Sequence, residues 1–220
     1  MTTMVNNPSL CSWSGGKDSC FALIKAEQEG FIPTVLLNVL NEEGKISRSH
    51  GIPSAVLQRQ AELAGIPIRL ISSSWADYET KFTDALINLK TRFNVSHAVF
   101  GDIDLQSHRD WEEKVCSNAG LEAVLPLWQI DRERLLDQML DGGIETMIIS
   151  CNEVMGEKFL GQILTKDLAE ELKLLDVDVC GENGEFHTLV LNCSLFSQKL
   201  EIKKGAKLHH EGYWFLQVSL

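Results

Sequence analysis

No part of the sequence is apolar for long enough to cross a membrane, because no run reaches about eighteen consecutive apolar residues. Residues 1–10 also lack the basic start and the apolar stretch of a signal peptide. We therefore expect a cytoplasmic protein without a membrane span. The chain has 220 residues, of which 44% are apolar and 23% charged. This composition predicts a soluble globular protein with a sizeable core and excludes disorder and collagen-like fibres.

Basic residues are scarce, since 20 Lys and Arg stand against 31 Asp and Glu and leave a net charge of −11. This sign disfavours binding to nucleic acid phosphates. The acidic composition neither requires nor forbids a homodimer. The six cysteines form no C-x-x-C pair, so neither a zinc site nor a redox dithiol is indicated. We expect reduced, mainly buried thiols.

The first half of the chain alternates short apolar runs with longer segments of helical period, which is typical of a parallel sheet covered by helices. The expected strands are residues 9–13, 33–40, 66–71, 98–101 and 123–125. The expected helices are residues 18–29, 54–64, 77–93 and 108–119, with Gly30, Gly65 and Gly120 as C-cap glycines. Four such crossovers predict an α/β domain over residues 1–125, with a doubly wound five-stranded parallel sheet.

After Pro126 the alternation of short apolar runs and helical segments changes, and we expect a smaller α+β domain over residues 126–220. Asp131 can cap a helix that two glycines end at residues 142–143. Further expected helices are residues 153–164 and 167–175, and further expected strands are residues 146–151, 186–191, 199–202 and 213–218. We find no internal repeat, low-complexity tract or long linker.

The segment that follows the first strand and opens the first helix is rich in glycine and hydroxyl groups. It consists of Ser12, Trp13, Ser14, Gly15, Gly16, Lys17, Asp18 and Ser19. Paired glycines let the backbone approach an anion, and free amides at a helix N-terminus bind phosphate. The Walker pattern is absent, because the glycines are adjacent and the lysine follows them directly. The segment predicts a phosphate-binding loop, and the alternative is a plain glycine turn.

A second polar segment, residues 179–188, places two carboxylates, an imidazole and a hydroxyl around two glycines. These groups belong to Glu182, Glu185, His187 and Thr188. On a turn or hairpin they could point into a cleft. Taken alone, the Gly-Asn-Gly pattern is more typical of a solvated turn.

Residues 14–19, Ser-Gly-Gly-Lys-Asp-Ser, resemble the signature of the ATP pyrophosphatase (PP-loop) superfamily. Residues 180–188 resemble the C-G-E-x-G-E-[FY]-x-T motif of diphthine ammonia ligases, a family within that superfamily. Further matches lie at residues 126–128, 147–149, 160–161, 191–196 and Lys199. Because two separate motifs occur in the right order and the matches span nearly the whole chain, the sequence is identified as a member of this family.

The resemblance implies a sheet of the adenine nucleotide alpha hydrolase-like type and an enzyme that cleaves ATP between its α and β phosphates. Such ligases convert a carboxylate on a modified histidine of translation elongation factor 2 into an acyl adenylate, which ammonia then displaces to form diphthamide. An adenylate supplies the leaving group that an unactivated carboxylate lacks. No glutaminase domain is visible, so free ammonium is the expected nitrogen source. ATP and Mg²⁺ are the expected cofactors.

The resemblance also suggests roles for individual residues. Residues 14–19 would hold the departing pyrophosphate, with Lys17 offsetting its charge and Asp18 as the Mg²⁺ ligand, and Ser12 would contact the nucleotide. Backbone around Asn38 would hold the adenine. Glu182 and Glu185 would orient or deprotonate ammonium, since two nearby carboxylates favour a cation and can exchange protons. His187 and Thr188 would contact the substrate beside them.

The sequence departs from the family after the fourth strand, where the ligases carry Ser-x-Tyr-Gln-Arg-x-Arg. Here Gly101, Asp102, Asp104, His108 and Arg109 follow instead, at the sheet edge where ligands bind. We expect Gly101 to contact the nucleotide and the other four residues to contact a substrate, with a changed pocket. The two aspartates and the histidine also suit a metal ion. The alternative is an acidic loop in which Asp104 or Ser107 caps the helix.

The remaining histidines and tryptophans carry weaker signals. His50 lies between the second strand and its helix, where the family has a related histidine, so it is a candidate for substrate contact. His209 and His210 are expected at the surface. The five tryptophans are expected to be packing anchors, namely Trp13, Trp75, Trp111, Trp128 and Trp214.

Three other functions remain open from the sequence. One is a related PP-loop ligase that acts on a different carboxylate, because diphthine exists only where elongation factor 2 carries it. Another is a PP-loop tRNA-modifying enzyme, which the acidic composition and the missing cysteine pair disfavour. The third is an adenine-nucleotide sensor without turnover, against which the two intact motifs argue.

Overall fold

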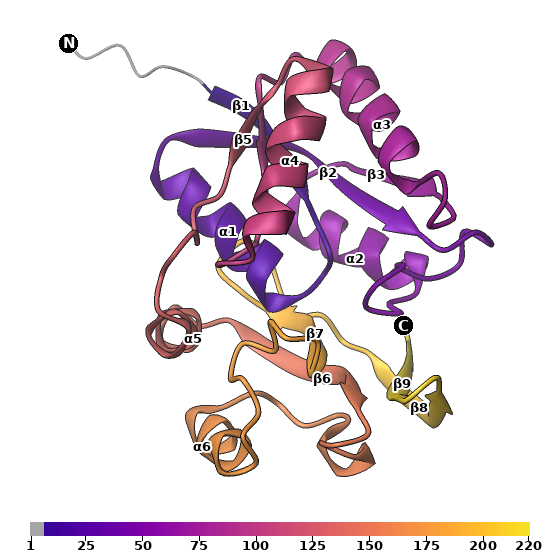
Figure 1. Cartoon of the computed structure of the whole chain (residues 1–220), viewed down its shortest axis with the longest axis vertical. Coiled ribbons are helices and arrows are strands. Elements are labelled where there is room, and N and C mark those ends of the chain that lie inside the picture. The colour runs from indigo at the N-terminus through magenta and orange to yellow at the C-terminus, as the bar shows by residue number, and fades with distance from the viewer. Residues whose placement is uncertain (1–6) are drawn as a thin grey trace.

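The first half of the chain folds into a parallel sheet with helices on both faces (Figure 1). The computed structural model describes residues 7–220; residues 1–6, which start the segment without a signal-peptide pattern, lie outside the described residues. The strands are β1 (Asn7–Ser12), β2 (Phe31–Leu40), β3 (Ile68–Ser72), β4 (His97–Val99) and β5 (Glu122–Val124). Their order, β3-β2-β1-β4-β5, is that of a doubly wound sheet, so the predicted fold class is confirmed.

Four helices connect these strands, as the sequence predicts. They are α1 (Lys17–Gln28), α2 (Ser54–Ala64), α3 (Tyr78–Phe93) and α4 (Gln106–Ala119). Gly65 and Gly120 end α2 and α4 in the left-handed conformation, and Gly30 follows the C-cap of α1. Buried residues of α1 and α2 form one core on one face of the sheet, and those of α3 and α4 form a second core on the other.

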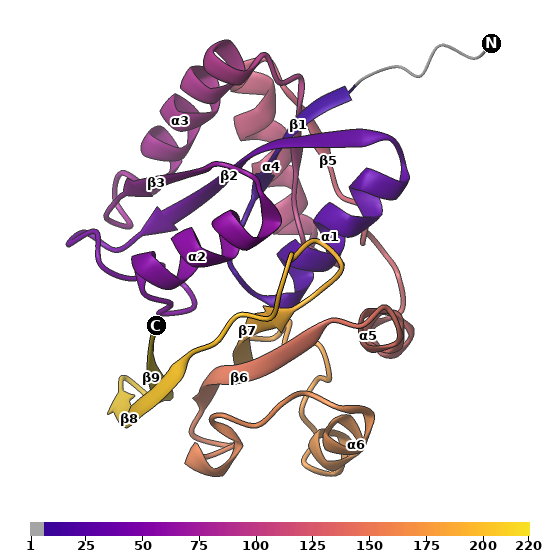
Figure 2. The same ribbon diagram turned by 180° about the vertical axis from the view of Figure 1, so that it is seen from behind.

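The second half of the chain builds a four-stranded antiparallel sheet below the first (Figures 1 and 2). Its strands are β6 (Glu145–Asn152), β7 (Phe186–Asn192), β8 (Lys203–His210) and β9 (Tyr213–Ser219), in the order β7-β6-β9-β8. The helices are α5 (Arg132–Asp141), the short 3₁₀ helix η1 (Glu157–Phe159) and α6 (Lys166–Leu174). Asp131 caps α5 as expected, by accepting a hydrogen bond from the backbone N–H of Arg134.

Two predicted elements of this half are wrong. No long helix covers residues 153–164, because Gly156 and Gly161 adopt φ angles of 78° and 82° and interrupt the segment, which forms turns and η1 instead. The predicted strand at residues 199–202 begins later, as β8 at Lys203. Every residue of β8 is exposed, so this edge strand has no buried face to give it an apolar alternation.

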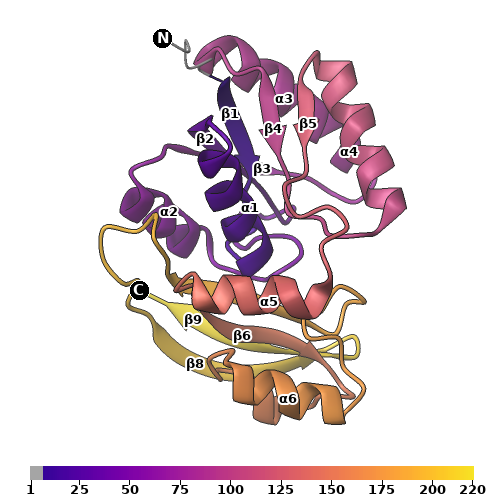
Figure 3. The same ribbon diagram turned by 90° about the vertical axis from the view of Figure 1, so that its left-hand side faces the viewer.

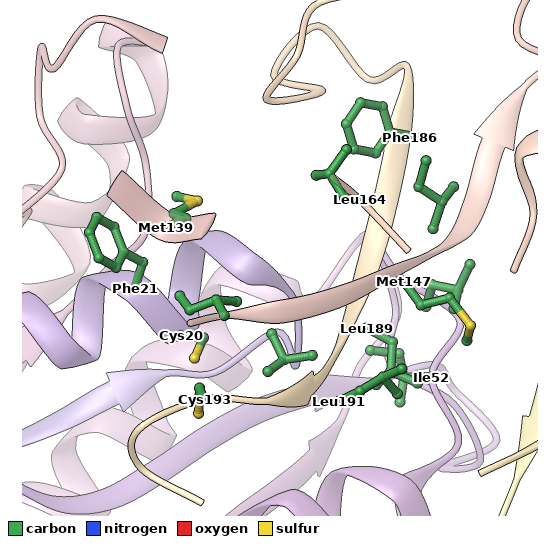
Figure 4. Close-up of a cluster of buried hydrophobic side chains, with 14 of the residues drawn as sticks. Cys20, Phe21, Ile52, Met139, Met147, Leu164, Phe186, Leu189, Leu191 and Cys193 are labelled. Carbon is green, nitrogen blue, oxygen red and sulfur yellow. The ribbon is translucent and has the colours of Figure 1, made fainter. Parts of the chain in front are cut away.

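The two sheets share a core. One continuous cluster of buried apolar side chains includes residues of α1, α2, β6 and β7, and Figure 4 shows part of it. Cys20 of α1 and Cys193 after β7 lie next to each other there (Figure 4). All six cysteines are buried and unpaired by disulfides, as predicted. The two sheets are therefore packed onto each other, with α5 between them in Figure 3. The domain boundary near Pro126 stays a prediction.

Gln60 of α2 joins the two halves by hydrogen bonds in this core. Its side chain accepts a hydrogen bond from Trp13 Nε1 at 3.0 Å. It donates to the backbone carbonyls of Gly15 at 3.1 Å and Val190 at 2.8 Å. Because Gln60 is completely buried, these three bonds replace contacts with water that the groups lost on folding.

Among residues 7–220, no helix combines the length and the apolar character that a membrane crossing needs.

We predict that Gln60→Met destabilises the protein by about 2–4 kcal/mol, because methionine matches the shape of glutamine but leaves buried donors and acceptors unpaired. Gln58→Met, on the exposed side of the same helix, is the matched control and is expected to change stability by less than about 0.5 kcal/mol. Urea unfolding of both variants measures the effect. Equal stabilities would contradict the assigned role of Gln60.

Candidate active site

The phosphate loop, residues 12–19, leaves the carboxyl end of β1 and turns into the N-terminus of α1. Hydrogen bonds to its own hydroxyl groups stabilise the loop. The Ser14 N–H donates to Ser19 Oγ at 3.2 Å, and the hydroxyl oxygens of Ser14 and Ser19 lie 3.0 Å apart. The Gly16 N–H donates to Ser14 Oγ at 3.2 Å. The predicted placement of this segment between strand and helix is therefore confirmed.

The paired glycines are needed for packing inside the protein. Gly15 has a φ of 85°, and a Cβ there would lie 2.8 Å from Gln60 Oε1. A Cβ on Gly16 would lie 2.8 Å from His50 Nε2 and 3.1 Å from the Thr188 carbonyl oxygen. No side chain fits in these gaps, so the loop stays close to α2, His50 and β7.

Strand β7 holds the phosphate loop from the other half of the chain. The Val190 N–H donates to the Gly15 carbonyl at 2.9 Å, and the Lys17 N–H donates to Thr188 Oγ1 at 3.1 Å. The Lys17 ammonium group donates to the Cys180 carbonyl at 2.5 Å. The two sequence motifs, although far apart in the chain, therefore form one site.

A cavity of about 540 Å³ lies between the two motifs. Twelve of the predicted site residues line it: Ser12, Ser14, Lys17, Asp18, Ser19, His50, Gly101, Asp102, His108, Glu182, His187 and Thr188. Its position at the carboxyl end of the parallel strands is where doubly wound sheets bind ligands. Asn38 does not line the cavity; it is buried in β2, and its side-chain amide donates to the Trp13 carbonyl at 2.7 Å.

Lys17 and Asp18 form a largely buried ion pair at 2.8 Å at the floor of the cavity. Burial favours the neutral amine, but the charges of Asp18, Cys180 and Glu182 together with the Asp18 hydrogen bond outweigh it, so the pKa of Lys17 is raised and the ammonium persists. Burial raises the pKa of Asp18, although Lys17 opposes this. Burial and the Asp18 charge also raise the pKa of Glu182 to about 8, so this carboxyl group can gain or lose a proton near neutral pH.

His50 and His187 stack beside the loop, with ring centroids 4.5 Å apart. Burial and the Lys17 charge lower the pKa of His187 to about 4. Burial and the neighbouring His187 lower the pKa of His50 well below its ordinary value. Both imidazoles are therefore neutral at physiological pH and add no positive charge to the phosphate region.

Glu185 differs from Glu182, although the sequence treats the two as a pair. Its carboxylate accepts hydrogen bonds from the backbone N–H of Asn183 at 3.0 Å and from the Asn183 side chain at 3.1 Å. It also accepts a weaker bond from the Asp178 N–H at 3.3 Å. Glu185 does not line the cavity. Its hydrogen bonds instead stabilise the turn that positions Glu182.

The segment after β4, residues 101–109, contains the expected departure from the family motif. Some of its residues line the cavity and others do not. Gly101 lies against the start of α1, where a Cβ would be 2.7 Å from the Ser19 amide nitrogen, and this close approach brings Asp102 to the cavity. Asp102 Oδ1 pairs with His108 Nδ1 at 2.6 Å. The neighbouring Asp104 points elsewhere and pairs with Arg132 at 2.6 Å.

Two expectations for this segment are wrong, namely the metal set and the helix cap. Because Asp104 pairs with Arg132, the proposed metal set of Asp102, Asp104 and His108 does not come together. Helix α4 begins at Gln106 with Leu105 as its N-cap, and no side chain caps it. Arg109 lies outside the cavity; its Nε pairs with Glu113 at 2.7 Å, and its guanidinium group stacks over Trp128.

Aromatic residues form a wall of the cavity that the sequence did not reveal. Trp75, Tyr78 and Trp111 line it, with ring centroids of neighbouring pairs 5.7 Å apart. Trp75 was expected to be a packing anchor, but it is 71% exposed, and Arg48 stacks on its ring. Trp13 is buried as predicted, and His209 and His210 are exposed. An aromatic residue's place on a cavity wall has no periodic signature in sequence.

The side chains that line the cavity are compatible with the binding of a nucleotide and its magnesium ion. Asp18 Oδ1 and His50 Nδ1 are buried at the cavity without hydrogen-bond partners, so polar groups of a ligand can satisfy them. Within residues 7–220, no three His, Cys, Asp or Glu side chains gather into a ready-made metal site. Such a site is unnecessary for Mg²⁺, which commonly binds through one or two carboxylates and substrate phosphates.

The doubly wound sheet and the glycine loop at its carboxyl edge define the class as an α/β nucleotide-binding protein. Comparison with known families narrows the class. The family model described as the diphthamide synthase N-terminal domain matches residues 8–123, and the one described as the diphthamide synthase C-terminal domain matches residues 131–219. The chain therefore belongs to the diphthamide synthase family.

Curated relatives agree with this assignment. The chain is 27% identical to the diphthine–ammonia ligase of Mus musculus and 28% identical to that of Homo sapiens, in each case over 94% of this chain and 86% of the relative. It is 30% identical to the diphthine–ammonia ligase of Schizosaccharomyces pombe over 90% of this chain, which spans only 36% of that relative. A solved structure, a predicted subunit of tRNA methyltransferase from Methanocaldococcus jannaschii, aligns with a TM-score of 0.45 at 15% identity, covering 85% of this chain and 98% of that one.

We predict that Glu112→Gln becomes more stable relative to the wild type as the pH rises from 5 to 8. Burial raises the pKa of Glu112 from 4.5 to about 11, so the stability that its protonated form contributes is full below pH 4.5 and declines above it. Glutamine has no such proton to lose. The difference in unfolding free energy should grow by up to about 1.4 kcal/mol per pH unit.

Urea unfolding at several pH values measures this difference. Glu113→Gln, an exposed neighbour on the same helix, is the control and is expected to show no comparable trend. A pH-independent difference between Glu112→Gln and the wild type would show that Glu112 is ionised in the folded protein.

Proposed function

We propose that the chain is an ATP-dependent ligase that activates the carboxylate of diphthine on elongation factor 2 as an acyl adenylate and amidates it with ammonia. Membership of the diphthamide synthase family makes the chain a carbon–nitrogen ligase. The observation that carries the proposal is the joining of the two motifs around one cavity by the Lys17–Cys180 hydrogen bond. A cytoplasmic site of action follows from the same acceptor.

In the first step of the proposed reaction, a carboxylate oxygen of the acceptor attacks the α phosphorus of ATP. The bond between the α phosphorus and its bridging oxygen breaks, and pyrophosphate leaves. The buried ammonium of Lys17 offsets the charge that develops on the leaving group, because a charge in a water-poor site acts strongly. Ser14 and Ser19 lie in position to donate hydroxyl hydrogen bonds to phosphate oxygens. Mg²⁺, with Asp18 as its protein ligand, would supply further charge neutralisation.

In the second step, ammonia attacks the carbonyl carbon of the adenylate, the bond from that carbon to the phosphate oxygen breaks, and AMP leaves. Glu182 faces the cavity from the second motif, so its carboxylate is placed to attract ammonium. The aromatic wall formed by Trp75, Tyr78 and Trp111 lies in the same cavity and offers apolar contact to the acceptor side chain.

We predict that Lys17→Met lowers kcat/KM for pyrophosphate release by about 10²–10³-fold, because the charge that stabilises the leaving group is lost. The assay contains ATP, Mg²⁺, ammonium and elongation factor 2 that carries diphthine. Lys25→Met, near the other end of α1, is the matched control and should retain activity. The stabilisation of each variant by ATP in thermal unfolding reports on whether the nucleotide site remains.

No release by the wild type with this acceptor, alongside measurable ATP binding, would contradict the diphthine assignment. In that case release with another carboxylate would favour a related ligase, and co-purifying tRNA would favour a tRNA-modifying enzyme.

A second prediction separates the two glutamates of the C-terminal motif. Glu182→Gln should slow ammonia-dependent amide formation at least about tenfold with little loss of stability, because this side chain faces the cavity. Glu185→Gln should instead lower the unfolding free energy by about 1–3 kcal/mol, because its carboxylate accepts hydrogen bonds from the turn. Amide formation and thermal unfolding of both variants give the comparison. A reversed pattern would show that Glu185 is the reacting group.

A further inference from the structure

We propose that His108 is the base that removes a proton from ammonium in the amidation step, with Asp102 and Glu112 as positioning residues behind it. This inference rests on the proposed function and deepens it. It concerns the segment after β4 in which this chain departs from its relatives' motif, and it follows from three features of that segment.

The first feature is the pairing of the imidazole. His108 Nδ1 lies 2.6 Å from Asp102 Oδ1, so the carboxylate fixes the ring with its proton on Nδ1 and leaves the lone pair on Nε2. Among the contacts of residues 7–220, no hydrogen bond engages His108 Nε2. An imidazole held in this way by a carboxylate is the arrangement that general bases use.

The second feature is the place of the pair. Both side chains line the cavity that also contains Lys17, Asp18 and Glu182. The His108 side chain is 56% exposed, so a ligand in the cavity can reach it. Glu182 approaches from the opposite motif, and its charge contributes to the electrostatic environment of His108. The cavity therefore offers ammonium an attractive carboxyl group and a proton acceptor together.

The third feature is the support behind Asp102. Glu112 lies one helical turn after His108 on α4, so both side chains share the face of the helix that meets Asp102. Glu112 is only 3% exposed, and its carboxyl group hydrogen-bonds the Asp102 carboxylate. Two carboxyl groups form such a bond only when one carries a proton. Glu112 is the more buried of the two and holds it, which leaves Asp102 ionised for His108.

The pKa shifts of Asp102 and His108 agree with an ionised Asp102 and a protonated Glu112. Burial works to raise the pKa of Asp102, but its hydrogen bonds with His108 and Glu112 and the charge of His108 together outweigh burial and lower it. The bond to Asp102 raises the pKa of His108 above 6.5, which brings it closer to that of ammonium. The charges of Asp18, Tyr78 and Glu182 also couple to Asp102, and Glu182 couples to His108 as well.

The proton balance is simple. Neutral His108 takes one proton from ammonium through Nε2, and the ammonia that results attacks the carbonyl carbon of the adenylate. The bond from that carbon to the phosphate oxygen breaks as AMP leaves. The second proton is lost from the new C–N nitrogen to solvent, which gives the neutral amide. His108 then releases its proton to solvent and returns to its starting state.

The test compares ammonium with hydroxylamine as acceptors of the acyl group. Hydroxylamine is largely uncharged at neutral pH and needs no base to free its lone pair, so it bypasses His108. We expect His108→Asn to lower ammonium-dependent amide formation by about 10²-fold or more while hydroxamate formation persists. Diphthine-bearing elongation factor 2, ATP and Mg²⁺ are present in both assays. Exchange of labelled pyrophosphate into ATP monitors adenylation separately.

The pH profile tests the positioning residues. Asp102→Asn removes the bond that raises the pKa of His108, so this pKa should fall and the acid limb of the rate profile should move to lower pH. Glu112→Gln should keep the limb in place, because its amide can still donate a hydrogen bond to Asp102. His209→Asn is the matched control, since His209 pairs with Glu153 at 2.7 Å outside the cavity.

The outcomes separate the inference from the proposed function. Equal losses with ammonium and hydroxylamine in His108→Asn, or no loss with either, would overturn the role of His108 while leaving the ligase reaction intact. Absence of diphthine-dependent pyrophosphate exchange in the wild type would overturn the proposed function and the inference together. A selective loss with ammonium, together with the shifted limb in Asp102→Asn, would establish the base.

Discussion

The candidate active site depends on the hydrogen bonds that strand β7 makes to the phosphate loop. The bond from the Lys17 amide to Thr188 Oγ1 links residues 171 positions apart, and the Val190 N–H fixes the Gly15 carbonyl. A loop with two adjacent glycines has few conformational restraints of its own. The loop is therefore held in place by the antiparallel sheet, which explains why one buried core extends through both halves of the chain.

Burial gives the cavity its chemistry. Lys17 is a buried cation among Asp18, Asp102 and Glu182, and each of these groups changes the proton affinity of another. In water such charges would be screened, whereas here they keep Lys17 ionised, and burial together with the Asp18 charge raises the pKa of Glu182 to about 8. The same surroundings favour an incoming cation, as the proposed ligase reaction requires.

Apolar patterns in the sequence predicted the elements that have a buried face. They did not locate an element that has no buried face. The parallel strands carry continuous apolar runs because helices cover both faces, and their order follows from the crossovers. Strand β8 is exposed throughout, so its residues carry no apolar alternation and the strand was placed too early. Residues 153–164 contain enough apolar side chains for a helix, but Gly156 and Gly161 serve turns that only the packed chain requires.

The sequence by itself determined the sheet, the phosphate loop and the family, because short-range periodicity and two motifs carry that information locally. Only the tertiary structure decided which motif residues face the cavity. Glu182 and Glu185 look equivalent in sequence, yet one lines the cavity and the other accepts hydrogen bonds within the turn. Asp102 and Asp104 diverge in the same way, since Arg132 of α5 attracts Asp104 while His108 and Glu112 surround Asp102. Side-chain partners that come from distant elements are set by packing, and a linear pattern does not record them.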